Sequence, residues 1–85
     1  MKEHLDNIIK FDFYSDDFMD LMEKEIDCIK KSDEKDSFYV FARLKALYLR
    51  RKRLEKIESD NLVGKTKDSL KLIQAELEEY IRSLF

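Results

Sequence analysis

The chain contains no proline and a single glycine, Gly64, among its 85 residues. Folds built from many short strands depend on tight turns, and such turns use glycine for backbone conformations with positive φ. Long helices need few turns of this kind, and proline interrupts them. The sequence therefore predicts an all-α fold.

Apolar residues recur at steps of three and four in several segments, which is the spacing of one face of an α-helix. Ser15 is a suitable N-cap for the first long helix, because its hydroxyl can accept a hydrogen bond from an unpaired backbone N–H. Short turns between long helices favour antiparallel neighbours. We therefore expect a single domain, residues 1–85, folded as a three-helix antiparallel bundle with a short N-terminal helix or arm and coiled-coil-like packing. Its predicted parts are the arm at residues 1–14 and helices at about residues 15–31, 37–58 and 66–83.

The charge is distributed unevenly, although the net charge is only −2. Residues 1–36 carry six Lys and Arg against twelve Asp and Glu, whereas residues 37–67 carry nine against three. An acidic first third beside a basic middle third indicates attraction within the fold and a capacity to steer charged partners.

The second predicted helix has an apolar front half followed by four cations. Ten of the twelve residues from 38 to 49 are apolar or aromatic, and residues 50–53 are Arg, Arg, Lys and Arg; we call these four the basic collar. A helix that is apolar nearly all round is either buried on several sides or exposes an interface. A three-helix monomer cannot cover all of this surface, so we expect a homodimer or another protein partner.

The basic collar has two possible roles. It can pair within the fold with Asp16, Asp17 and Asp20, which an antiparallel arrangement brings level with it, or it can bind phosphate groups of a nucleic acid. Basic footprints usually accompany an isoelectric point above about 9, and the value for this chain is about 5.4. Internal pairing is therefore the simpler expectation.

No catalytic, cofactor or metal site is predicted. His4 and Cys28 are each the only residue of their kind, so neither a metal site of histidine and cysteine ligands nor a Cys–His pair is expected. The segment 63–66, Val-Gly-Lys-Thr, lacks the earlier glycine of a phosphate-binding loop, because position 59 is Ser. A lone cysteine, and no apolar run near 18 residues, predict a cytoplasmic protein without a membrane segment or signal peptide.

The sequence thus favours a small non-enzymatic protein–protein interaction module that acts as a regulator, inhibitor or adaptor by occluding or bridging a partner. A nucleic-acid-binding regulator that uses the collar is the alternative. The small, highly charged, proline-free composition resembles that of short regulatory proteins of bacteria, phages and plasmids. The expected partner-binding residues are the aromatic and cationic side chains of the arm and of the second helix: Phe11, Phe13, Tyr14, Phe38, Tyr39, Phe41, Arg50, Arg51 and Arg53.

Overall fold

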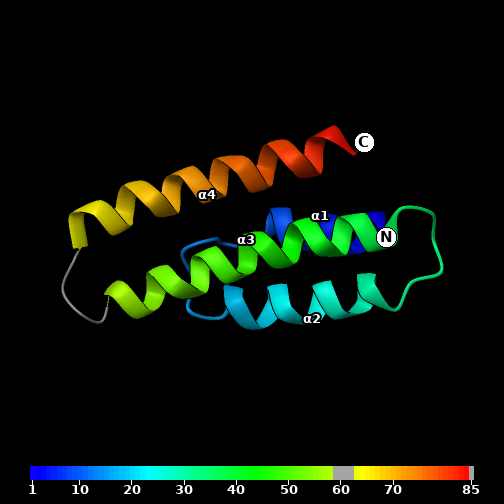
Figure 1. Cartoon of the computed structure of the whole chain (residues 1–85), viewed down its shortest axis with the longest axis horizontal. Helices are drawn as coiled ribbons and strands as arrows, with labels where there is room; N and C mark the ends of the chain where they lie inside the picture. Colours follow the sequence, from blue (N-terminus) through cyan, green and yellow to red (C-terminus); the bar gives the residue numbers. More distant parts are fainter. Residues whose placement is uncertain (59–62, 85) are drawn as a thin grey trace.

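The computed structural model describes the backbone of residues 1–58 and 63–84, and the side chains of residues 1–56 and 67–84. The described residues form helices only, so the prediction of an all-α fold is confirmed (Figure 1). None of these helices combines the length and the apolar character that crossing a bilayer requires. In chain order the helices are α1 (Lys2–Lys10), α2 (Phe18–Lys30), α3 (Ser37–Glu58) and α4 (Val63–Ser83).

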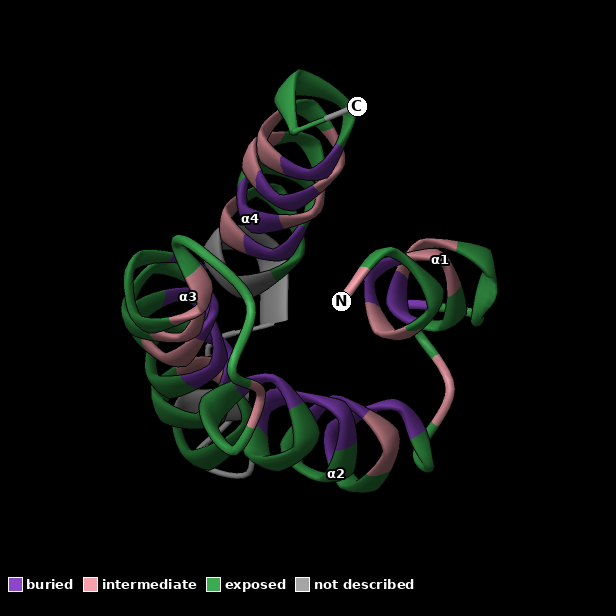
Figure 2. Cartoon of the chain, turned by 90° about the vertical axis from the view of Figure 1, so that its right-hand side faces the viewer, coloured by how far each residue is buried: buried purple, intermediate pink, exposed green. Residues whose placement is uncertain are grey.

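The four helices surround one elongated core. Helix α3 packs against both α2 and α4, and α1 contacts both α2 and α4 on the other side (Figure 2). The molecule measures 42 × 21 × 19 Å along its principal axes. Leu5 and Ile8 of α1 are each only 1% exposed, so α1 contributes two side chains to the core.

The core consists of the apolar face of each helix together with one aromatic residue from the α1–α2 connection. Its positions follow the three- and four-residue spacing of amphipathic helices. The side chains that are exposed by 2% or less include Leu5, Ile8, Phe18, Met22, Ile26, Ile29, Val40, Leu44, Leu47, Ile73 and Ile81.

Helix α2 begins at Phe18, three residues after the predicted start at about residue 15. Before it the chain makes two consecutive turns, in which the N–H of Tyr14 donates to Asp12 Oδ1 at 3.0 Å and that of Asp17 to Ser15 Oγ at 3.3 Å. The side chain of Ser15 is therefore engaged in a turn that precedes the helix. Short polar side chains compete for backbone groups in this way at turns and caps alike, so their presence does not fix the first helical residue.

Helix α3 coincides with the predicted range, whereas α4 starts at Val63, before the predicted residue 66. Gly64 therefore lies within the first turn of α4. Of the residues between the predicted helices at 37–58 and 66–83, residues 59–62 lie outside the described part of the chain. The turn before α3 places Asp36 in the left-handed region, with φ 68°, and the carbonyl of Asp36 accepts from the N–H of Val40.

Helix α1 is attached to the bundle by polar contacts as well as apolar ones. The carboxylate of Glu25, on α2, is 6% exposed and bonds to His4 Nδ1 and, at 3.3 Å, to Asn7 Nδ2. The N-terminal ammonium group pairs with Glu34 at 2.7 Å. A buried carboxylate without partners would be costly, so these contacts fix the position of α1 on α2.

Candidate functional site

Helix α3 has one face that is buried in the core. Val40, Leu44 and Leu47 are each at most 1% exposed, and Arg51 is 5% exposed. These residues follow at steps of four, three and four, so they lie on one side of the helix. Together with Tyr48, which is also buried, they form the side of α3 that packs against α2 and α4.

The opposite face of α3 is apolar too, yet it is exposed. Phe38 and Tyr39 are 71% and 72% exposed, and Leu49 is 44% exposed. Ala42 and Ala46 lie between them and are also exposed. We call these five residues the α3 ridge; large side chains stand at its two ends and small ones in its middle. The rings of Phe38 and Tyr39 meet edge to face, with centroids 6.0 Å apart.

The side of the ridge that borders α4 carries arginines that are paired with a carboxylate. Arg50 donates to Glu76, and Arg43 lies 4.0 Å from the same carboxylate. Arg43 also lies over the ring of Tyr80, 5.8 Å from its centroid. Burial raises the pKa of the Tyr80 hydroxyl above its usual value, and the nearby Arg43 opposes that shift. The arginines on this side are therefore partly neutralised by their own chain.

A shallow, mostly apolar pocket of about 270 Å³ lies between α3 and α4 at the collar. Leu72, on α4, is 57% exposed and lines this pocket together with Arg50 and Arg53. Exposed apolar surface is therefore also present on α4, beside two arginines of the collar.

The side of the ridge that borders α2 carries lysines that lean away from the ridge. Lys45 Nζ lies 5.0 Å and Lys52 Nζ 5.8 Å from the ring centroid of Tyr48, and Lys30 Nζ lies 5.2 Å from that of Phe41. A cation over an aromatic face is attracted by its ring electrons. The middle of the ridge is therefore bordered by cations but not covered by them.

Arg51 belongs to the interior. Its guanidinium donates to the carbonyl oxygen of Phe13 at 2.8 Å and to Glu55, and it lies 4.9 Å from the ring centroid of Phe13 and 5.2 Å from that of Phe18. Its Nε is buried without a hydrogen-bond partner. The spacing of residues 44, 47 and 51 alone puts Arg51 on the same side of the helix as Leu44 and Leu47, but it does not reveal that the charged group reaches the backbone of the α1–α2 connection.

The side chains of the basic collar therefore point in different directions and have different partners. Within residues 1–56 and 67–84, the ion pairs of Arg50 and Arg51 are made with Glu76 and Glu55. Pairing inside the fold does occur, but its acids come from α3 and α4, whereas Asp16, Asp17 and Asp20 were expected. The reason is that α4 lies against α3 on the side of Arg50, and that Glu55 follows Arg51 by one helical turn.

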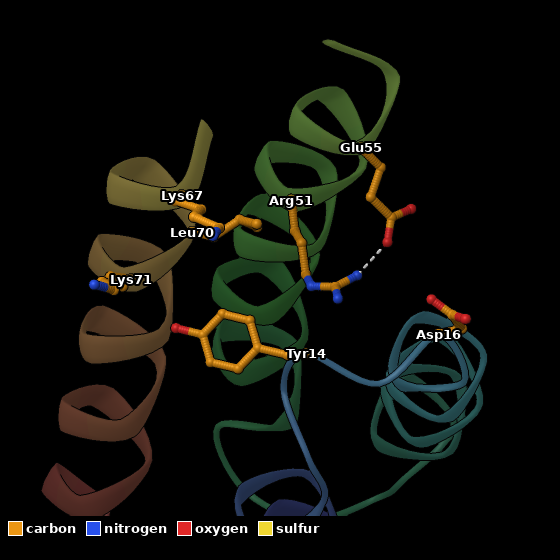
Figure 3. A pocket seen from close by; sticks show the side chains of 7 residues that line it. All are labelled: Tyr14, Asp16, Arg51, Glu55, Lys67, Leu70 and Lys71. Atoms are coloured by element: carbon orange, nitrogen blue, oxygen red, sulfur yellow. Dashed lines mark hydrogen bonds and ion pairs between the residues drawn. The ribbon is translucent and has the colours of Figure 1, made fainter. Parts of the chain in front are cut away.

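A second exposed aromatic group lies at the α1–α2 connection. Phe11 is 37% and Tyr14 52% exposed. Tyr14 borders a pocket of about 460 Å³ between this connection, α3 and α4, which three cations and two acids also line (Figure 3). The dashed contact between Arg51 and Glu55 lies in this pocket (Figure 3). Its charges of both signs largely compensate one another.

The structure thus distributes the nine expected partner-binding residues over several places. Phe38 and Tyr39 stand together at one end of the ridge, and Arg50 and Arg53 lie at the other. Phe11 and Tyr14 are exposed on the α1–α2 connection, Phe41 is half-buried, and Phe13 and Arg51 are buried.

Helical spacing places Ala42, Ala46 and Leu49 with Phe38 on the side of the helix away from Leu44 and Leu47, but these three residues were not among the expected partner-binding residues. Leu72 was not expected there either, because its exposure depends on how α4 is rotated against α3.

Among the residues whose side chains are described, no three His, Cys, Asp or Glu gather closely enough to hold a metal ion. Comparison with known proteins found no matching family model, no matching curated protein and no matching solved structure. Any functional inference therefore depends on the surface of the chain itself.

Proposed function

We propose that this protein is a small non-enzymatic protein–protein interaction module, which acts as a regulator, inhibitor or adaptor by occluding or bridging a partner. The observation that carries the proposal is the α3 ridge. One face of α3 already supplies the core, yet the opposite face exposes two aromatic rings and a leucine. An exposed apolar surface of this extent, rimmed by charges, is typical of a contact site.

The ridge has the features of an interface with a few dominant anchors. Phe38 and Tyr39 are large, rigid side chains that lose little rotamer freedom on binding, and aromatic residues and arginines commonly dominate binding energy. Arg50 and Arg53 stand at the rim, where charge steers an approaching partner and fixes its orientation more than it adds affinity. In this proposal α2, α3 and α4 form a three-helix antiparallel bundle that presents the ridge, and α1 completes the core.

Nucleic-acid binding by the collar remains the weaker proposal. It needs several cations directed at phosphates, but Arg51 is buried and Arg50 pairs with Glu76. Two of the four collar cations are therefore already committed to contacts within the chain. A titration with duplex and single-stranded DNA at about 50 mM salt tests it, since phosphate binding at this salt is strong and falls steeply as salt is raised.

Photo-cross-linking in the source cells tests the proposed function. A photoreactive phenylalanine analogue at Ala42, in the middle of the ridge, is expected to form a covalent adduct with another protein chain. The same analogue at Ala75 is the matched control, because Ala75 is also an exposed alanine in a helix but lies on α4. The adduct at Ala42 should map to one defined peptide of the partner and should be lost when Phe38 and Tyr39 are both changed to Ser.

The proposal is contradicted if positions 42 and 75 yield the same adducts, or if the adduct at position 42 persists in the Phe38→Ser, Tyr39→Ser variant. Equal adducts would show that the ridge is ordinary surface that meets other proteins only by chance.

A further inference from the structure

We infer that the α3 ridge binds a second copy of this chain, with the two α3 helices antiparallel and Ala46 beside the two-fold axis. This inference rests on the proposed function, because it names the occupant of the same surface. It adds an orientation and a register, and both follow from the order of residues along the ridge.

The ridge is self-complementary when it is reversed. Phe38, Ala42, Ala46, Leu49 and Arg53 follow at steps of four, four, three and four residues, over about 22 Å of helix. An antiparallel copy centred near Ala46 places Phe38 and Tyr39 opposite Arg53 of the second copy. Leu49 then faces Ala42 of the second copy, so a large side chain meets a small one.

The ends of the ridge supply opposite chemical groups. A guanidinium over an exposed aromatic ring is attracted to the ring face, and the antiparallel arrangement brings Arg53 of one copy to Phe38 and Tyr39 of the other, twice per dimer. The turn before α3 is acidic, with Asp33 and Asp36 both exposed, and in this register Asp36 comes level with Lys56 of the second copy, just beyond its collar. A parallel arrangement would instead place collar against collar, where like charges repel.

The middle of the ridge permits close approach. The distance between packed helices depends on the side chains at the contact, and Ala42 and Ala46 are small. The neighbouring cations do not fill this space, because Lys45 lies over Tyr48 and Arg43 lies near Glu76. The positive charges of Lys45 and Arg43 are thereby held away from the middle of the ridge, which reduces the repulsion between two facing ridges.

The area of the ridge implies a weak dimer. A helix face about 22 Å long and about 10 Å wide covers less than the roughly 800 Å² per partner of a standard interface. We therefore expect a dissociation constant no tighter than micromolar, because even interfaces of standard size extend to micromolar affinity. Such a dimer exchanges readily and leaves Phe11 and Tyr14 of both copies exposed for a further partner.

Disulfide trapping tests both the occupant and the register. In a Cys28→Ala background, which removes the exposed native thiol, Ala46→Cys should form a covalent dimer under mild oxidation of the purified protein. Two cysteines join only when their Cα atoms lie within about 7 Å, and only residues close to the two-fold axis satisfy this. Ala75→Cys is the matched control and should remain monomeric at the same protein concentration and under the same oxidation.

Sedimentation equilibrium of the otherwise unchanged chain gives an independent readout. Ala46→Glu should weaken dimerisation at least tenfold, because two carboxylates would meet at the axis, whereas Ala75→Glu should leave it unchanged. A purified protein that stays monomeric up to about 1 mM, or cysteines at 46 and 75 that cross-link equally, would overturn the inference. If that monomer still gives an adduct with a different protein at position 42 in cells, the proposed function survives and only the second copy is excluded.

Discussion

Replacing Arg51 with alanine is expected to lower the free energy of unfolding by about 2–4 kcal/mol. The change leaves the carbonyl oxygen of Phe13 without its donor and removes the guanidinium that lies against Phe13 and Phe18. It also leaves a space in the core, because the side chain is 5% exposed. Urea denaturation followed by far-ultraviolet circular dichroism measures the effect.

Arg53→Ala is the matched control for this prediction. Arg53 is an exposed arginine of the same helix, and its loss should change the free energy of unfolding by less than about 0.5 kcal/mol. Small single-core domains have about 3–5 kcal/mol of net stability, so the Arg51→Ala protein should be partly unfolded at room temperature. Equal stabilities of the two variants would show that Arg51 does not hold the α1–α2 connection to α3.

Leu47→Ala is expected to lower the free energy of unfolding by about 2–5 kcal/mol, as for other buried leucines that leave a cavity. Leu47 is 1% exposed and lies in the middle of the core face of α3. The measurement is again urea denaturation. The protein concentration should lie well below the dissociation constant expected for the dimer, so that dimerisation does not add to the apparent stability.

Leu49→Ala tests whether the outward face of α3 serves contact with another molecule rather than stability of the fold. Leu49 lies two residues further along the same helix but is 44% exposed, so its loss should cost less than about 0.5 kcal/mol of stability. It should instead weaken dimerisation in sedimentation equilibrium, because Leu49 belongs to the ridge. If Leu47→Ala and Leu49→Ala destabilised the fold equally, the division of α3 into a core face and a contact face would be wrong.

Sequence composition and helical spacing were enough to predict the helices, because the absence of proline and the single glycine leave few other folds. The first residue of a helix was harder to predict where a short polar side chain can act either as an N-cap or within a turn. Ser15 accepts a hydrogen bond within a turn rather than at the first residue of α2. The start of α4 at Val63, before the predicted residue 66, places Gly64 in the first turn of that helix.

The candidate site was predictable only in part. That α3 is apolar on two sides follows from its sequence, but which side faces the core depends on where α2 and α4 pack. Phe13 and Arg51 were expected at an interface because aromatic and cationic side chains often lie there. Instead they contact each other, because the α1–α2 connection, which carries Phe13, lies against α3 at Arg51.

The structure leads to one specific inference, that α3 meets a second copy of this chain through its outward face. Backbone amide spectra of the purified protein, recorded by NMR from about 10 µM to about 1 mM around the expected dissociation constant, test it most directly. The signals that shift with concentration should cluster on the ridge, from Phe38 through Ala46 to Leu49, and those of the Ala46→Glu variant should not shift. Spectra that are independent of concentration, or shifts that cluster at Phe11 and Tyr14 instead, would contradict it.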